Sequence, residues 1–383
     1  MIRPCCLLLA CFCVFGYTLF EGVATAEEVF RTNVFVSGQE GYSMFRIPSV
    51  VVTPQGTVLA FCEGRKTSAA DDGDIDLLLK RSHDQGRTWG PLELVHEEGG
   101  TANVTIGNPC PVVDATTGTI WLTLCRDNKH VLVTSSQDDG QKWSPPKDIS
   151  SSVTRTEWGW VATGPGVGIQ LQRGQKPGRL VIPCDHSRVI DGQRVMVSHV
   201  FYSDDSGQTW QLGGSLDQHT DECQVVELAN GSLMLNMRNY WGTAGGRPDR
   251  GSKRAIATSV DAGETWSELS FDDTLVEPNC QASLLTYQTA DTSSNNYKYL
   301  LFSNPASSST RHRLTVRLSK NEGQTWPWAR RLHAGPAAYS CLTVLADDTI
   351  GCFYEAGTNS PYESLVFARF DLDWLQSNAK DHN

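Results

Sequence analysis

Ser82-His83-Asp84-Gln85-Gly86-Arg87-Thr88-Trp89 is the stretch of sequence that decides the fold, because the chain repeats its pattern five times. The pattern is Ser-x-Asp-x-Gly-x-Thr-Trp, and its copies begin at residues 82, 136, 203, 259 and 319. These octets therefore start 54, 67, 56 and 60 residues apart, and only Lys142 (for Thr) and Asn321 (for Asp) depart from the key positions. A repeat at this period is typical of a propeller, a solenoid or an array.

Each residue type of the octet suits a tight turn between two strands. Asp at the third position can hydrogen-bond the backbone further along the turn. Gly at the fifth position adopts backbone angles that other residues resist. Trp at the eighth position places a large apolar ring on a neighbouring layer. We therefore interpret the octets as β-hairpin turns of the scaffold, and not as functional sites.

Short apolar or β-branched runs, separated by turn signals, fill the intervals between octets. Early examples are residues 49–53, 57–61, 75–79 and 119–124, and only residues 374–380 suit a short helix. Each interval holds about four strands, and propeller blades are four-stranded sheets around a central axis. With octets roughly 59 residues apart on average, the sequence predicts an all-β, six-bladed β-propeller with four-stranded antiparallel blades. It is expected to form a single domain over residues 27–383, closed by a strand near residues 29–36.

The N-terminus has the pattern of a secretory signal peptide at residues 1–26. Arg3 precedes an apolar run over residues 5–20, and Ala24-Thr25-Ala26 has the form of a cleavage site. The run is short for a span of about 20 residues. We expect a secreted, periplasmic or extracellular chain; an uncleaved or lumenal anchor and a lipoprotein box at Leu8-Leu9-Ala10-Cys11 are the alternatives. No later stretch is long and apolar enough to cross a membrane.

Composition limits the partners and cofactors. The formal net charge of −11 argues against nucleic acid and acidic membrane surfaces. Eight cysteines follow the leader without any Cys-x-x-Cys, which leaves disulfides and small buried hydrophobes both open and gives zinc little support. The acidic run at residues 71–76 lacks the glycine and glutamate of an EF-hand loop, so no metal site is expected. No phosphate loop or dinucleotide fingerprint is present, and no cofactor is predicted.

A second set of motifs does not repeat and lies between the octets. It comprises Phe45-Arg46-Ile47-Pro48, Glu63-Gly64-Arg65, Asp221-Glu222, Met237-Arg238-Asn239 and Ala338-Tyr339-Ser340. The Phe-Arg-Ile-Pro motif upstream of the repeated octets resembles the exo-sialidases (neuraminidases) of the bacterial and animal type, in which the octets are called Asp boxes. The resemblance covers essentially the whole chain after the leader.

The resemblance implies that Arg46, Arg238 and Arg311 hold the carboxylate of a terminal sialic acid. Three converging guanidinium groups suit a carboxylate because they form paired, charge-assisted hydrogen bonds. Arg313 and Arg317 lie close to Arg311, which is chosen because it stands three residues before the Leu-Thr-Val-Arg run where the family places this arginine.

The resemblance also implies the reacting groups. Tyr339 matches the nucleophile: a neutral phenol is not repelled by the substrate carboxylate, and sialidases are a known exception to carboxylate nucleophiles. A phenol needs a base, and Glu222 matches that role. Asp71 matches the general acid, with Asp72, Asp74 and Asp76 as competitors.

Flanking roles are also implied by the family. Arg65 matches an arginine that assists near the carboxylate and O4, and Asn108 matches a contact to the N-acyl arm. Trp158-Gly159-Trp160 and the glycine-rich residues 163–168 are candidates for the glycerol side, and a glycine-rich blade loop of the scaffold is the alternative.

The function expected from the resemblance is an exo-α-sialidase that hydrolyses terminal sialic acids of glycoproteins, glycolipids or oligosaccharides with retention. One alternative is a non-catalytic sialoglycan-binding propeller, which would not need Tyr339, Glu222 and Asp71 together. Another is a trans-sialidase or an intramolecular trans-sialidase, which would share every catalytic residue.

Overall fold

The computed structural model describes residues 29–288 and 299–377, and its regular secondary structure is almost entirely antiparallel strands. The predicted leader lies outside the described residues. The first sheet pairs β2 (Met44–Val52), β3 (Val58–Arg65), β4 (Ile75–Ser82) and β5 (Glu93–His96). The second pairs β6 (Ile106–Val113), β7 (Ile120–Arg126), β8 (His130–Ser136) and β9 (Lys147–Asp148).

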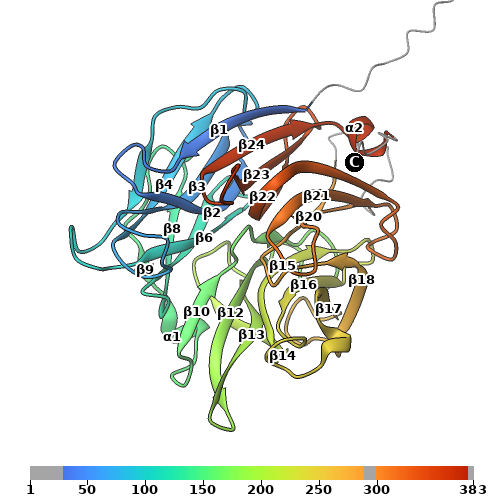
Figure 1. Ribbon diagram of the computed structural model, residues 1–383. Helices are drawn as coiled ribbons and strands as arrows, with labels where there is room; N and C mark the ends of the chain where they lie inside the picture. The colour runs from blue at the N-terminus through green and yellow to red at the C-terminus, as the bar shows by residue number, and fades with distance from the viewer. Residues whose placement is uncertain (1–28, 289–298, 378–383) are drawn as a thin grey trace, which may run out of the picture.

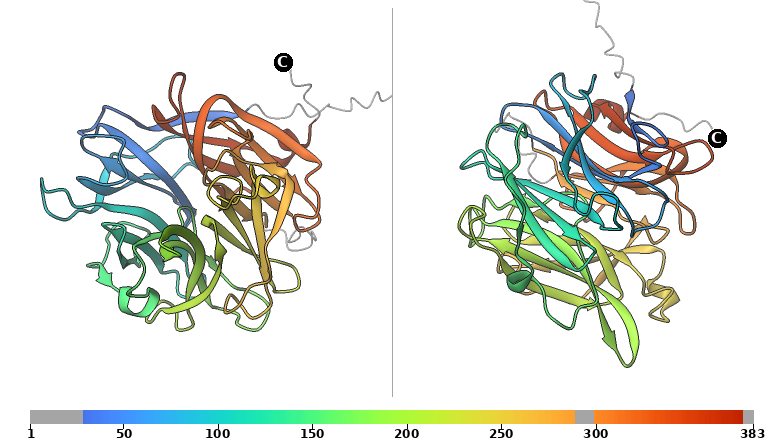
Figure 2. Two further views of the ribbon diagram at one scale, coloured as in Figure 1. Left: turned by 60° about the horizontal axis from the view of Figure 1, so that its bottom comes forward. Right: turned by 90° about the vertical axis from the view of Figure 1, so that its left-hand side faces the viewer.

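The remaining sheets continue in chain order around a common centre, from green to red in Figure 1. The third contains β10 (Trp160–Thr163), β11 (Ile169–Gln170), β12 (Leu180–Ile190), β13 (Gln193–Ser203) and β14 (Gln211–Gln218), with β11 paired to β12. The fourth contains β15 (Thr220–Glu227), β16 (Leu233–Asn239), β17 (Lys253–Ser259) and β18 (Ser270–Val276). The two views of Figure 2 show the same succession.

The fifth sheet has seven strands and corrects the predicted blade number. Its members are β19 (Ser283–Thr286), β20 (Leu300–Pro305), β21 (His312–Ser319), β22 (Trp328–Val344), β23 (Ile350–Ala356), β24 (Ser364–Phe370) and β1 (Phe30–Val36). The prediction of six separate four-stranded blades is therefore wrong. The structure has four separate sheets in a propeller-like arrangement and one seven-stranded sheet.

The cause lies in β22, whose 17 residues pair first with β21 and then with β23. Gly335-Pro336 inside this strand reads as a turn signal in the sequence. The backbone nevertheless stays paired on both sides, because Ala337 N donates to Arg311 O at 3.0 Å and Gly357 N donates to Pro336 O at 3.1 Å. The continuous strand β22 thus joins two groups of strands that the octet spacing had assigned to separate blades.

The octets are hairpin turns, as predicted, and each connects the third strand of a repeat to the strand that follows. In the first octet Ser82 Oγ donates to Asp84 Oδ1 at 2.8 Å, and Asp84 Oδ1 accepts from Thr88 N at 2.8 Å. Gly86 has φ +79° and donates its N–H to Ser82 Oγ at 2.8 Å. A Cβ at Gly86 would lie 2.1 Å from the Phe367 ring, so the glycine also permits close packing.

The octet tryptophans connect neighbouring sheets. Trp89 packs edge-on against Phe367 of β24 at 5.3 Å between ring centroids, and Trp143 against Phe61 of β3 at 5.6 Å. Trp210 meets Trp121 of β7 at 6.3 Å in the same way. Each of these indole rings packs against the preceding sheet in the circular arrangement. The octets therefore stabilise the contacts between neighbouring sheets.

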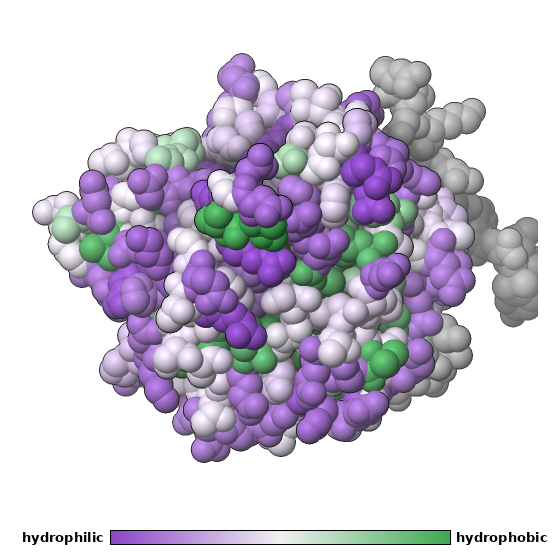
Figure 3. All heavy atoms as spheres, turned by 90° about the horizontal axis from the view of Figure 1, so that it is seen from below, coloured by the Kyte–Doolittle hydropathy of each residue, from purple (hydrophilic) through white to green (hydrophobic). Residues whose placement is uncertain are grey.

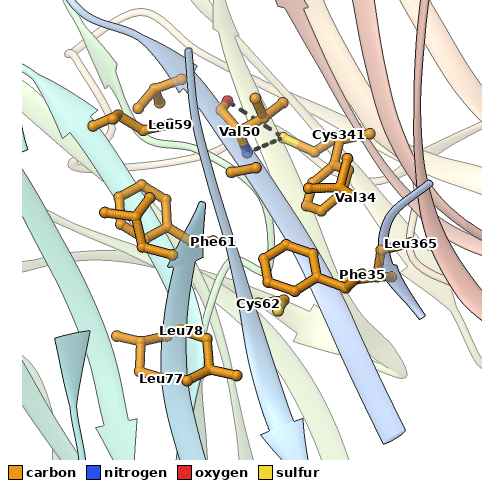
Figure 4. Packing of buried hydrophobic residues seen from close by; sticks show 14 of the residues in the cluster. Val34, Phe35, Val50, Leu59, Phe61, Cys62, Leu77, Leu78, Cys341 and Leu365 are labelled. Atoms are coloured by element: carbon orange, nitrogen blue, oxygen red, sulfur yellow. Dashed lines mark hydrogen bonds between the residues drawn. The ribbon is translucent and has the colours of Figure 1, made fainter. Parts of the chain in front are cut away.

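Ring closure brings the N-terminal strand next to the end of the chain. β1 pairs antiparallel with β24, which confirms the predicted closing strand near residues 29–36. Figure 4 shows buried side chains from β1, β2, β3, β4, β22 and β24 in one cluster, with Phe35 and Phe61 among them. The first and fifth sheets therefore share a core.

Helical structure is scarce in the described residues. The short helices are α1 (Ser150–Val153), α2 (Leu372–Gln376) and the 3₁₀ turn η1 (Pro248–Arg250). None of these described helices is long and apolar enough to traverse a bilayer. The eight cysteines of the described residues are all buried free thiols. The face in Figure 3 is mostly hydrophilic, with hydrophobic residues in small separate groups.

Candidate active site

The site forms where several strands bend beside a polar residue. Register irregularities occur at Arg46 in β2, after Gly107 in β6, after Thr220 in β15 and after Ala337 in β22. A bulge re-aims the side chains next to it. Ile47 has φ +61° and Asn108 has φ +54°, backbone angles that are uncommon for side-chain-bearing residues and strained for a β-branched one. Four elements far apart in sequence thereby present polar side chains to one place.

These side chains surround a cavity of about 420 Å³, a size that suits a small ligand. Six of the eight residues predicted for the site line it: Arg65, Asp71, Asn108, Glu222, Arg238 and Tyr339. The other two, Arg46 and Arg311, contact the Tyr339 ring, with their Cζ atoms 5.0 Å and 5.5 Å from its centroid. The structure therefore brings the whole predicted set together.

Tyr339 is the centre of the arrangement. Its hydroxyl donates to Glu222 Oε1. Arg238 Nη1 donates to Glu222 Oε2 at 2.8 Å and to the Tyr339 hydroxyl at 3.3 Å. One phenol thus has a carboxylate as its proton acceptor and three guanidinium groups around it.

The surroundings keep this phenol neutral in the free protein. Burial, followed by the adjacent Glu222 carboxylate, raises the pKa of Tyr339 well above its ordinary value, against the lowering effect of Arg238, Arg46 and Arg311. A neutral phenol is a weak nucleophile unless a base removes its proton. Glu222 is in hydrogen-bond contact with this hydroxyl.

Arg46 is positioned by an acidic residue that the sequence prediction missed. Glu355 of β23 is fully buried and accepts from Arg46 Nε at 2.9 Å and Nη2 at 3.3 Å. It also accepts from the backbone N–H groups of Ile47 and Tyr339, both at 3.1 Å. The available signal was a lone acid inside the otherwise apolar run of β23, since a buried charge needs a partner.

Arg311 lies immediately before β21. Its Nη1 donates to the Tyr362 hydroxyl at 2.9 Å and its Nη2 to Asn279 O at 3.3 Å. Among Arg311, Arg313 and Arg317, all of which the structure describes, Arg311 is the one whose guanidinium contacts the Tyr339 ring. This contact favours Arg311 over Arg313 and Arg317 as the third member of the cluster.

Asp71 lies on the rim, with its side chain 65% exposed. Its Oδ1 is 3.4 Å from Arg46 Nη1 and 2.9 Å from Arg65 Nη1. Arg65 is buried and also bonds Glu63 Oε2 through Nε at 3.0 Å and Nη2 at 2.7 Å. Asn108 directs its amide N–H to Asn128 Oδ1 at 2.7 Å.

Two buried aspartates on the cavity wall were not predicted. Asp221 precedes Glu222 and lies 3.7 Å from Arg238 Nε, and Asp185 of β12 accepts from Trp160 Nε1 at 3.1 Å. Burial, reinforced by the Asp221 and Glu222 carboxylates, raises the pKa of Asp185 well above its usual value. Trp160 itself belongs to the stretch that the sequence placed beside the site.

Metal ligation finds no support in the residues that the structure describes, where no group of three or more His, Cys, Asp or Glu side chains is arranged to hold an ion. The groups available at the cavity are clustered arginines that suit an anion, a phenol hydrogen-bonded to a carboxylate, and a carboxyl group at the rim.

Comparison with known proteins places the chain in a family. Residues 56–352 match the family described as BNR repeat-like domain. The sialidase of Micromonospora viridifaciens is 34% identical over 90% of this chain, which spans 54% of that protein's length. The exo-alpha-sialidase of Aspergillus fumigatus is 30% identical, over 88% of this chain and 86% of that protein.

A solved structure, Hadza microbial sialidase Hz136, superimposes with a TM-score of 0.77 at 30% identity, covering 90% of this chain and 69% of that one. Because both the family match and the Aspergillus relative cover most of the chain, the protein belongs to the sialidase family.

Proposed function

We propose that the protein is an exo-α-sialidase that hydrolyses terminal sialic acids from glycoconjugates. The observation that carries the proposal is the Tyr339 phenol, which is hydrogen-bonded to Glu222 and surrounded by the guanidinium groups of Arg46, Arg238 and Arg311. A terminal sialic acid has its carboxylate on the reacting carbon. The same place therefore needs positive charge and a nucleophile that is not an anion.

In the proposed first step, the Tyr339 oxygen forms a bond to the anomeric carbon as the bond to the leaving sugar breaks. Glu222 takes the phenolic proton, and a protonated Asp71 gives its proton to the leaving oxygen. The substrate carboxylate lies between the arginines. General acid–base help of this kind contributes about 10²–10⁴-fold in rate.

In the second step, water attacks the anomeric carbon of the sialyl–tyrosine intermediate while Asp71 accepts its proton. The bond to Tyr339 breaks, and Glu222 returns the proton to the phenol. Two displacements at one carbon give net retention of configuration, as in other retaining glycosidases.

Tyr339→Phe tests this assignment. A fluorogenic aryl sialoside is the substrate, and we expect turnover to fall by at least about 10³-fold because the nucleophile is missing. Binding of free sialic acid, measured by calorimetry, is expected to survive because the arginines remain. Full activity of the variant contradicts the nucleophile assignment. A parent protein that binds sialosides but cleaves none supports the alternative of a sialoglycan-binding protein.

Proton NMR of the first product tests the stereochemistry. An α-sialic acid formed before mutarotation supports retention by hydrolysis. A β-anomer as the first product contradicts the double displacement, and an anhydro sugar identifies an intramolecular trans-sialidase.

We also propose export of the chain, on the basis of the leader pattern at residues 1–26. N-terminal sequencing of protein recovered outside the cytoplasm is expected to begin near Glu27. Recovery of a chain that still carries the leader contradicts cleavage there.

A further inference from the structure

A short buried segment between β10 and β11 connects strands of several sheets. It comprises Gly164-Pro165-Gly166, which we name the central segment. Gly164 N donates to Pro183 O of β12 at 2.7 Å, and Gly164 O accepts from Cys223 N of β15 at 3.4 Å. Gly166 O accepts from Ser49 Oγ of β2 at 2.8 Å. The described residues that line the cavity of about 420 Å³ do not include this segment, so its contacts lie within the protein.

Gln224 of β15 connects the central segment to the strand that carries the proposed base. Its Nε2 donates to Pro165 O at 3.2 Å and to the carbonyl of Cys223, the residue after Glu222, at 2.9 Å. The side chain is buried, with 1% of it exposed. A Cβ at Gly166, whose φ is +132°, would lie 2.5 Å from Gln224 Nε2. Glycine at this position therefore permits the close approach of the glutamine.

Gln281, which lies two residues before β19, connects the same carbonyl to the strand that carries the proposed nucleophile. Its Nε2 donates to Pro165 O at 3.1 Å and to Ser340 O at 3.0 Å. Its Oε1 accepts from Ser340 N at 3.0 Å. Both Gln281 and Ser340 are buried. The amide group of Gln281 thus bonds both backbone polar groups of the residue that follows Tyr339.

The two glutamines share one acceptor, the Pro165 carbonyl. They thereby link the neighbours of Glu222 and Tyr339, two residues that are 117 positions apart in the chain. A buried polar network whose members are hydrogen-bonded holds a single arrangement of the chain. The separation of a nucleophile and its base matters because a displacement of about 1 Å can cost 10²-fold in rate. The network therefore connects the two strands whose relative position sets the contact between phenol and carboxylate.

We propose that the central segment positions the Tyr339 hydroxyl at Glu222 for attack on the anomeric carbon. Its positioning residues are Gln224, Gln281 and Ser49, which connect it to the strands β15, β22 and β2. The proposal rests on the proposed function, because it takes Tyr339 as the nucleophile and Glu222 as its base. The three arginines keep their proposed contact with the substrate carboxylate.

Labelling with 2,3-difluorosialic acid separates attack from binding. In this step the Tyr339 oxygen forms a bond to C2, the C2–F bond breaks, fluoride leaves and Glu222 takes the phenolic proton. The fluorine at C3 slows hydrolysis of the adduct, which intact-protein mass spectrometry counts and peptide mapping assigns to Tyr339. The maximal rate constant of labelling, kinact, therefore reports attack, and the half-saturating concentration, KI, reports binding.

For Gln224→Met and Gln281→Met we expect kinact to fall by at least about 10-fold, because the phenol and its base are displaced from one another. KI is expected to change by less than about 3-fold, because the arginines remain in place. A purely structural role would lower stability without slowing the labelling of the folded protein. A kinact within about 2-fold of the parent value in either folded variant overturns the proposal.

The double variant tests whether the two glutamines act through one carbonyl. A connection that is broken at one end is not weakened much further by breaking the other end. Adding Gln281→Met to Gln224→Met is therefore expected to lower kinact by no more than about 3-fold more, because coupled residues are not additive. Losses that multiply fully would show two independent supports and overturn the shared role of the Pro165 carbonyl.

Ser49→Ala covers the case in which the Met variants do not fold. It removes one hydrogen bond to the central segment, at Gly166 O, and leaves both glutamines in place. We expect kinact to fall by about 3–10-fold, a smaller displacement than in the Met variants, with KI unchanged. A parent value of kinact in the folded Ser49→Ala protein overturns the proposal.

Gln170→Met is the matched control, because it is the same substitution at a glutamine that bonds outside the site. Gln170 Nε2 donates to Asp114 Oδ1 at 2.7 Å, and its Oε1 accepts from Ala115 N at 2.8 Å. It is expected to lower stability but to leave kinact within about 2-fold, as for a site distant from the reacting groups. A loss of kinact as large as in the other two Met variants would assign the effect to general destabilisation and overturn the proposal.

The parent protein distinguishes this proposal from the proposed function. A parent that hydrolyses no sialoside and takes no label at Tyr339 refutes the proposed function itself. A parent that is labelled at Tyr339, together with variants labelled at the same rate, overturns only the positioning role of the central segment.

Discussion

At the scale of single residues, the site depends on charges that are buried and individually partnered. The Glu355 carboxylate accepts a hydrogen bond from Arg46. The Glu222 carboxylate accepts hydrogen bonds from Arg238 and from the Tyr339 hydroxyl. Buried charges are stable only when they are paired and hydrogen-bonded. The site therefore needs the buried partners of its residues as well as the residues themselves. Only the site residues belong to recognisable sequence motifs.

Glu355→Ala tests this dependence. Removing the acceptor of four hydrogen bonds leaves the Arg46 guanidinium without its buried carboxylate partner, which typically costs about 3–5 kcal/mol. We expect urea unfolding to show that loss, together with a raised KM for a sialoside because Arg46 is no longer held.

Glu355→Gln is the matched control, since it keeps the size and one oxygen acceptor of the side chain. It is expected to be more stable than Glu355→Ala but still to bind substrate more weakly than the parent. Equal stability of the parent and the Ala variant would rule out a structural role for the Arg46–Glu355 pair.

At the scale of elements, the octet turn is a local structure that the sequence specifies almost completely. In each copy the first, third, fifth and seventh residues bond within the same eight residues, including Lys142 in the second copy and Asn321 in the fifth, so no distant partner is needed. In the fifth copy Asn321 stands in place of Asp and still accepts from Ser319 Oγ at 2.9 Å and Thr325 N at 3.0 Å. The replacement of Asp by Asn in this copy therefore indicates that the turn requires the Oδ1 acceptor at the third position.

Asp84→Ala is expected to lower the free energy of unfolding by about 1–2 kcal/mol, because three hydrogen bonds to the carboxylate are lost. Asp84→Asn keeps the Oδ1 acceptor and is expected to cost less than half as much. Sialoside hydrolysis should be unchanged in both, as neither touches the cavity. An Asn variant as unstable as the Ala variant would contradict the assigned role of Oδ1.

The stability difference also depends on pH. Burial by itself raises the pKa of the Asp84 carboxyl group. Hydrogen bonds from Thr88 and Ser82 outweigh this effect and lower that pKa from 3.8 to about 2. The folded pKa lies below the unfolded one, so the stabilisation is fully present above pH 3.8 and declines as the pH falls towards 2. The free energies of unfolding of the parent and of Asp84→Ala should therefore converge as the pH falls from 3.8 towards 2. A difference that stays constant over this pH range would exclude a contribution from the titration of Asp84.

At the scale of the whole molecule, the ring is closed by packing as well as by strand pairing. Phe35 of β1 is fully buried, with its ring 5.2 Å from Phe45 of β2 and 6.2 Å from Phe353 of β23. One side chain thus joins the N-terminal strand to the first sheet and to the seven-stranded sheet. The same closure brings Arg46 of β2 next to Tyr339 of β22.

Phe35→Ala is expected to destabilise the protein by about 3–5 kcal/mol, as is usual for the loss of a buried aromatic ring. Phe30→Ala is the matched control in the same strand, because Phe30 is 40% exposed, and it should change stability by less than about 0.5 kcal/mol. Thermal unfolding measures both. Similar melting temperatures for the two variants would show that ring closure does not depend on this contact.

The sequence by itself determined what depends on local or repeated information. The octets act through bonds within eight residues, so their turns and the all-β class could be predicted. The eight site residues were identified by their resemblance to sialidase motifs, and the structure brings them to one cavity. Their catalytic and binding roles remain predictions.

Only the tertiary structure decided how the repeats join and what supports the site. The sheet count was mispredicted because the octet spacing assigned each interval its own four-stranded blade, whereas β22 pairs with β21 and then with β23 and so belongs to a single seven-stranded sheet. Glu355 and Gln281 carry no motif, since they act on residues 309 and 59 positions away in the chain. A hydrogen bond between such residues exists only once the ring has closed, and no local pattern in the sequence encodes it.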